Sequence, residues 1–252
     1  MTGSTGVARA AVGMIAVAGL AACAERMAGA GDDLAQLYQA AIYDAAVKRP
    51  SFQRKLVPID PRVSEVTVVT LTTRKDDPVA PTDAVTRSKG VLRLKRDSGG
   101  TGRLLSATWV SLPSESRPAC RGAPDPVLAL EQLLGMPPAG GDWELVQFSV
   151  APEHVFRPCA SGPEINTIQC SFALPKRSSS PETQLFVFGQ MWSSYIADFQ
   201  DPGYPFTGMG WTYNWSPASK DHYGVSEYVV KEGAPVSDIR VFTPSEFCNG
   251  AG

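Results

Sequence analysis

The chain starts with a short apolar segment whose length decides which residues can belong to the folded protein. Arg9 is the only charged residue before residue 25, and a 13-residue apolar run extends from Ala10 to Ala22. A bilayer-spanning helix needs about 20 apolar residues, so this run is too short to cross a membrane. A basic start, a short apolar core and small residues at its end are typical of a cleavable secretory signal. We therefore expect the folded protein to begin after this segment.

The end of the apolar run predicts where the signal is removed. Leu20-Ala21-Ala22-Cys23 resembles the lipobox of bacterial lipoproteins, in which the cysteine receives diacylglycerol and becomes the mature N-terminus. The resemblance implies two or three acyl chains, such as palmitate, on Cys23, and more than one chain anchors a protein stably. It places the protein in the cell envelope, on the exported, periplasmic side, and Ala24 rather than Asp favours an outer membrane. The alternative is a plain secretory signal that is cut after Ala24.

The rest of the chain is long enough for one large domain. Removal of the first 22 of 252 residues leaves 230, with 22 basic and 25 acidic residues and a formal charge of −3. We expect a flexible tether over residues 23–31 and a single globular domain over residues 32–252. The acidic balance and the lack of a basic stripe exclude the usual nucleic-acid-binding classes.

Four cysteines remain after Cys23, and an even number in an exported chain predicts two disulfides among Cys120, Cys159, Cys170 and Cys248. Three pairings are possible, and the spacing does not choose between them. The sequence has no C-x-x-C pair, and neither histidine lies at ligand spacing from a cysteine, so we expect no metal site and no cofactor.

Two helices are predicted from periodicity and caps. Asp32 and Asp33 start the first, apolar residues recur at helical spacing, and Pro50 ends it. Asp125 and Gly135 bracket the second, because Asp is a favoured N-cap and Gly a favoured residue just past a helix.

The remainder reads as strands joined by glycine- and proline-rich turns, which predicts an α+β fold dominated by antiparallel sheet. A glycine-rich turn at residues 97–102 predicts a hairpin between its flanking strands. The predicted strands are residues 63–73, 90–96, 103–112, 143–150, 167–174, 184–188, 225–231 and 236–242. Residues 113–126 are predicted to be a connection.

An aromatic-rich segment lies between Trp192 and Tyr228, where ten of 37 residues are aromatic. Aromatic faces on loops can stack on sugar rings or other flat ligands, and they can equally fill the core beneath irregular loops. Trp211, Tyr213 and Trp215 alternate, so they share one side of a strand and are the candidate ligand-binding residues.

The candidate catalytic residues are His222 with Asp221 and Glu227, because a histidine titrates near neutral pH and carboxylates can orient it or exchange protons with it. Ser226 is a nearby hydroxyl. None of them lies in a hydrolase motif such as G-x-S-x-G, S-x-x-K or H-E-x-x-H, so the assignment rests on proximity in sequence alone.

Two functions are therefore expected from the sequence. The first is a membrane-anchored envelope lipoprotein with a non-enzymatic role, binding a glycan, a peptide or a protein partner near the membrane. The alternative is an anchored hydrolase that uses His222 with Asp221 or Glu227.

Overall fold

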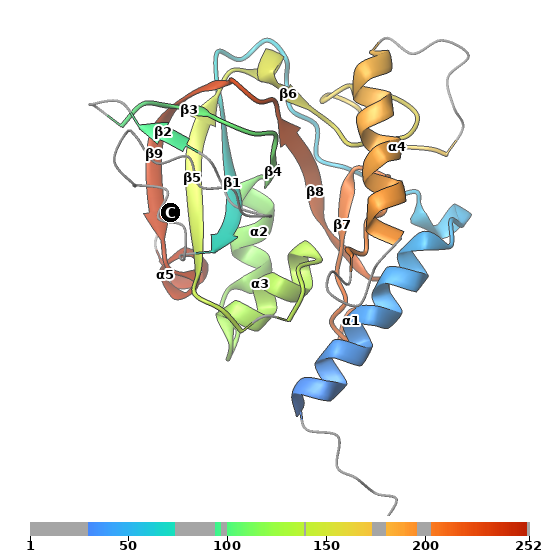
Figure 1. The fold of residues 1–252 in the computed structure, drawn as a ribbon. Coiled ribbons are helices and arrows are strands. Elements are labelled where there is room, and N and C mark those ends of the chain that lie inside the picture. Colours follow the sequence, from blue (N-terminus) through green and yellow to red (C-terminus); the bar gives the residue numbers. More distant parts are fainter. Residues whose placement is uncertain are drawn as a thin grey trace, which may run out of the picture.

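The computed structural model describes residues 30–73, 94–96, 100–138, 140–172, 180–195 and 203–250. The lipobox-like residues 20–23 and most of the expected tether lie outside this part of the chain. Within it, the architecture is α+β, with a sheet of nine antiparallel strands and helices packed around it (Figure 1). The predicted α+β class with an antiparallel sheet is confirmed, but the sheet does not dominate the described residues, because the structure contains more helices than the sequence predicts.

The sheet has the strand order β2-β3-β9-β5-β1-β4-β8-β6, and β7 pairs with β8 beside this path. Its long strands are β1 (Val66–Thr73), β5 (Trp143–Val150), β8 (Tyr223–Val230) and β9 (Pro235–Phe242). Its short strands are β2 (Leu94–Arg96), β3 (Gly102–Leu104), β4 (Thr108–Ser111), β6 (Val155–Phe156) and β7 (Trp211–Tyr213). Most neighbours in the sheet are distant in sequence, which is why the sequence alone does not give their order.

The predicted hairpin is present where the chain is described, because Leu94 pairs with Leu104 across β2 and β3. The predicted strand over residues 103–112 is instead divided in two. Its first part, β3, also pairs with β9, whereas its second part, β4, pairs with β1 and β8. A bend at residues 105–107 therefore separates the two strands, which occupy different positions in the sheet.

The central strands β1 and β5 are buried on both faces. Val68 and Phe148 belong to one apolar cluster, and their neighbours Val69 and Leu145 belong to another on the opposite face. Successive side chains of a strand point to opposite faces, so both sides of these strands must be covered. Helices α2 (Pro113–Cys120), α3 (Pro126–Leu134) and α5 (Pro244–Asn249) pack against one another and cover the second face.

The predicted second helix is confirmed as α3, with both caps formed. The Asp125 carboxylate accepts a hydrogen bond from the Leu128 amide at 3.0 Å. Gly135 ends the helix at φ 67°, a left-handed conformation that glycine adopts without steric cost. The helices α2 and α5 were not predicted, because prolines at residues 113, 118 and 244 are typical of turns. In the structure, Pro113 and Pro244 are the first residues of these helices, a position where proline is tolerated.

Helices α1 (Ala30–Ala46) and α4 (Pro181–Tyr195) lie next to each other on the β7 side of the molecule (Figure 1). Helix α1 confirms the first predicted helix. The predicted strand over residues 184–188 is wrong, because these residues form the first half of α4. Short apolar runs fit strands and helices alike, and here the helix continues through Tyr195. A strand is also predicted over residues 167–174, but its described part, residues 167–172, forms no strand. Two single-turn helices complete the fold, η1 (Pro50–Phe52) and η2 (Pro152–His154).

Two disulfides are present, as the sequence predicts. Cys120 in α2 pairs with Cys248 in α5, and Cys159 pairs with Cys170. Disulfides are typical of proteins exported to an oxidising compartment. Among the helices that the structure describes, none is both long and apolar enough to cross a membrane.

Candidate functional site

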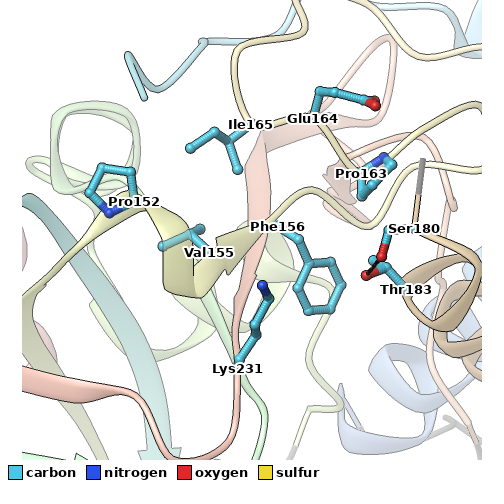
Figure 2. Close-up of a pocket in the computed structure, with 9 residues that line it drawn as sticks. All are labelled: Pro152, Val155, Phe156, Pro163, Glu164, Ile165, Ser180, Thr183 and Lys231. Carbon is cyan, nitrogen blue, oxygen red and sulfur yellow. Dashed lines mark hydrogen bonds between the residues drawn. The ribbon is translucent and has the colours of Figure 1, made fainter. Parts of the chain in front are cut away.

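A surface pocket of about 390 Å³ lies between β6, the start of α4 and the loop at residues 163–165 (Figure 2). It is an open hollow rather than an enclosed cavity; small-molecule sites are usually apolar with a few polar groups. The pocket follows that pattern, with an apolar majority and both signs of charge. Its lining residues are Pro152, Val155, Phe156, Pro163, Glu164, Ile165, Ser180, Thr183 and Lys231.

The polar groups of the pocket come from separate elements. Ser180 and Thr183 lie at the start of α4, with their hydroxyl oxygens 2.8 Å apart. The Lys231 ammonium, just past β8, donates a hydrogen bond to the Glu153 carbonyl oxygen at 3.0 Å. In Figure 2, Lys231 and Glu164 lie on opposite sides of β6. An ammonium, a carboxylate and two hydroxyls around an apolar floor suit a small polar ligand that carries an apolar group. No sequence pattern marks this site, because the residues that form it are up to about 80 positions apart in the chain.

The candidate catalytic histidine is held in a structural role. His222 Nδ1 lies 3.0 Å from the Asn214 carbonyl oxygen, and its ring stacks on Tyr213 with centroids 4.9 Å apart. The neighbouring Asp221 forms an ion pair with Arg54 at 3.6 Å. His222 therefore fastens the turn that precedes β8 to β7, and Asp221 fastens the same turn to the segment after α1.

The structure does not bring His222 and Glu227 together. They are five positions apart along the extended chain at the start of β8, which corresponds to roughly 16 Å. Glu227 lies opposite Ser111 of β4. Among the described residues, no hydrogen bond joins His222 to a carboxylate at this place.

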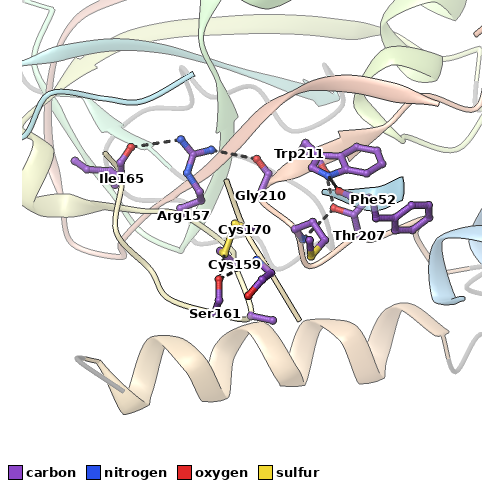
Figure 3. The surroundings of a disulfide bond; sticks show 12 residues. Phe52, Arg157, Cys159, Ser161, Ile165, Cys170, Thr207, Gly210 and Trp211 are labelled. Atoms are coloured by element: carbon purple, nitrogen blue, oxygen red, sulfur yellow. Dashed lines mark hydrogen bonds between the residues drawn. A yellow bond between two sulfur atoms is a disulfide. The ribbon is translucent and has the colours of Figure 1, made fainter. Parts of the chain in front are cut away.

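A fully buried arginine lies beside the second disulfide (Figure 3). Arg157 donates hydrogen bonds to the carbonyl oxygens of Val57, Ile165 and Gly210 at 2.6, 3.3 and 3.2 Å. It also donates to the Tyr228 hydroxyl at 2.8 Å and lies over the Tyr228 ring. Burial lowers the pKa of Arg157, whereas Tyr228 and Glu115 favour its charged form. A methyl group on Gly210 would lie 2.8 Å from the Arg157 side chain, so this position requires a glycine.

The buried Ser226 and the half-buried Glu115 form a hydrogen-bonded pair next to Arg157. The Ser226 hydroxyl donates to Glu115 Oε1 at 3.2 Å and accepts a hydrogen bond from the Val57 amide at 2.8 Å. Burial raises the pKa of Glu115, and hydrogen bonds from Ser226 oppose this effect. Although a serine beside a carboxylate is a possible nucleophile–base pair, Ser226 has no exposed surface. The pair therefore joins α2 to β8 and does not face a substrate.

Glu227 should make the stability of the fold depend on pH. Its Oε2 is buried without a hydrogen-bond partner among the described residues, and burial raises the pKa of Glu227 from 4.5 to about 8. Between these values the folded state holds a proton that the unfolded state has lost, so stability falls as the pH rises. We expect the free energy of unfolding to fall by about 3 kcal/mol between pH 5 and pH 8 through this group.

The measurement is urea unfolding across this pH range for the wild type and Glu227→Gln. The variant should show a shallower pH slope, because the amide mimics the protonated acid. Glu153→Gln, a change at an exposed residue, is the control. An unchanged slope in Glu227→Gln would show that Glu227 is ionised in the folded protein.

The candidate ligand-binding rings lie in the core. Trp211, Tyr213 and Trp215 are 0, 2 and 2 % exposed. Trp211 Nε1 donates to the Phe52 carbonyl oxygen at 3.0 Å, as Figure 3 shows. The Tyr213 hydroxyl donates to Asp44 at 2.7 Å, and Trp215 Nε1 donates to the Met136 carbonyl oxygen at 2.9 Å. Of the two alternatives left open by the sequence, core filling fits this placement, because no ring face is available for stacking.

Other ligands are not indicated by the described residues. No group of three or more His, Cys, Asp or Glu side chains is arranged to hold a metal ion in that part of the chain. The cysteines that the structure describes are all paired with one another. No protein-family model, curated protein or solved structure matches this chain.

Proposed function

We propose that this chain is a lipid-anchored protein of the bacterial cell envelope whose domain binds a partner near the membrane without catalysing a reaction. The partner classes are a glycan, a peptide or a protein. The observation that carries the proposal is the pair of disulfides in a domain that follows a lipobox-like sequence. Both features are typical of export to an oxidising compartment.

The short distance between the proposed anchor and the fold supports a role at the membrane. Helix α1 starts at Ala30, seven residues after Cys23. A flexible chain of that length has a mean reach of roughly 15 Å. A protein acylated at Cys23 would thus hold its domain close to the lipid surface, in the outer membrane if the cell has one.

The placement of the polar residues supports binding over catalysis. His222 Nδ1 contacts the Asn214 carbonyl oxygen, Glu227 lies opposite Ser111 in the sheet, and Ser226 is buried. The pocket beside α4 instead combines an apolar floor with hydroxyls and two opposite charges. Such a lining suits recognition of a small group on a larger partner, such as a peptide side chain or a sugar substituent.

Lipidation of Cys23 is the test of this proposal. Protein extracted from membranes should have the mass of a chain that begins at Cys23 and carries acyl groups. Cys23→Ser should abolish the acyl mass and change the fractionation of the protein. Ala22→Gly, a small-for-small change next to the cysteine, is the matched control and should preserve acylation. A soluble mature form that begins at Glu25 would overturn the proposal.

A further inference from the structure

One wall of the pocket beside α4 belongs to a segment whose two ends are joined by the second disulfide. Cys159 and Cys170 are 11 positions apart, and the segment 160–169 lies between them. Three residues of this segment line the pocket, namely Pro163, Glu164 and Ile165. The other lining residues lie on η2, on β6, at the start of α4 and just past β8. The disulfide therefore fixes both ends of the segment that supplies this wall.

The segment 160–169 buries little of its own surface. All of its residues are described, and they form no helix or strand. Ala160 and Ile165 are buried, whereas the other side chains of the segment are exposed or half-buried. A segment with few buried apolar groups and no regular structure has low local stability. The bond between its two ends is therefore a large part of what holds this wall in place (Figure 3).

The hydrogen bonds between this segment and its surroundings are mainly accepted by its carbonyl oxygens. The carbonyl oxygens of residues 163, 165 and 168 accept from the amides of Arg157, Ile59 and Leu56 at 2.9, 2.9 and 2.8 Å. Such bonds contribute little net stability, because water competes for both partners. The Arg157 guanidinium has two further carbonyl acceptors outside the segment. Opening of the segment would therefore not leave this buried charge without partners.

We propose that oxidation of Cys159 and Cys170 assembles this wall, so that the pocket forms only after export, an inference that rests on the proposed binding role of the pocket. The two thiols lose two protons and two electrons as the S–S bond forms, and a disulfide of an exchange partner takes them up and becomes two thiols. Cross-linking a loop of this length shifts the equilibrium between its open and closed forms by about a hundredfold. Both cysteines are buried, which shields the finished bond from thiols and keeps the wall in place.

The experiment measures amide hydrogen exchange in the full protein and in the double variant Cys159→Ala with Cys170→Ala. The amides of Leu56 and Ile59 are the readout, because their acceptors lie in the segment. In the double variant they should exchange nearly as fast as in an unstructured peptide, whereas the amides of β5, which pairs with β1, should stay protected. Gln169→Ala, at an exposed residue of the same segment, keeps the disulfide and is the matched control. It should leave both sets of amides protected.

Two results would overturn the proposal. Protected Leu56 and Ile59 amides in the double variant would show that the segment keeps its place without the bond. Loss of protection in β5 as well would show that the bond supports the whole fold and not this wall. Intact mass at Cys23 is measured on the same wild-type sample, so the two proposals can fail separately. A protein without acyl groups whose segment opens only in the double variant would retain the disulfide-dependent wall and remove the anchor.

Discussion

Removal of the Cys120–Cys248 disulfide should lower the free energy of unfolding by about 5 kcal/mol, because the bond closes a loop of 128 residues in the unfolded chain. Both sulfurs are buried between α2 and α5, where they also hold the last helix against the domain. A loss of this size is comparable to the whole stability of many domains. The double variant Cys120→Ala with Cys248→Ala is preferable to serine, which would bury two new hydroxyls.

The second disulfide supplies the matched control. Cys159–Cys170 closes a separation of only 11 residues, so the same loop-entropy reasoning gives about 3 kcal/mol for its removal. Urea unfolding of both double variants, under oxidising conditions, measures the difference. An equal or smaller loss for the Cys120–Cys248 variant would show that loop closure is not the main contribution of this bond.

Truncation of Trp215 to alanine should lower the free energy of unfolding by about 3 to 5 kcal/mol, as for other buried tryptophans. Its ring contacts Tyr38 of α1 edge-on at 5.8 Å. Its Nε1 bonds the carbonyl oxygens of Glu131 and Met136 at 3.2 and 2.9 Å. The side chain thus holds α1 to the end of α3, and its loss removes two hydrogen bonds and leaves a cavity; the Glu131 carbonyl oxygen still accepts from the Met136 amide at 2.8 Å.

The exposed Trp192 is the control for this experiment. Trp192→Ala should change the free energy of unfolding by no more than about 0.5 kcal/mol, as is usual at the surface. Thermal melting followed by circular dichroism compares the two variants. Cell-wall glycan fragments added to the wild type should leave the emission of the buried tryptophans unshifted. A shift that disappears in Trp215→Ala would instead restore the ring as part of a binding site.

The elements that the sequence predicted correctly are those fixed by local chemistry. Helix α3 has a capping aspartate at one end and a left-handed glycine at the other, and both act within a few residues. The prediction for the segment around Leu185 failed because an apolar run of four residues suits a strand as well as a helix. Tertiary packing favours the helix, because the consecutive residues Phe186 and Val187 both pack inward, whereas in a strand they would point to opposite faces.

The candidate sites were harder to predict, because they depend on contacts between distant residues. The buried position of Arg157 follows from carbonyl groups at residues 57, 165 and 210. No sequence pattern marks an arginine whose partners are backbone atoms. The alternation of Trp211, Tyr213 and Trp215 correctly indicated a shared side of the chain, but whether that side faced solvent depended on where α1 packed.

The nested pairing of the four cysteines has a consequence for the order of oxidation. A secreted chain emerges N-terminus first, so Cys120 reaches the oxidising compartment before Cys159 and Cys170, whereas its partner Cys248 emerges almost last. Pairing in order of emergence would join Cys120 to Cys159, which is not a native bond. Cys120 must therefore either stay reduced until export is complete or be exchanged out of a wrong bond by thiol attack. In the second case, maturation of this protein depends on the thiol-exchange capacity of its compartment.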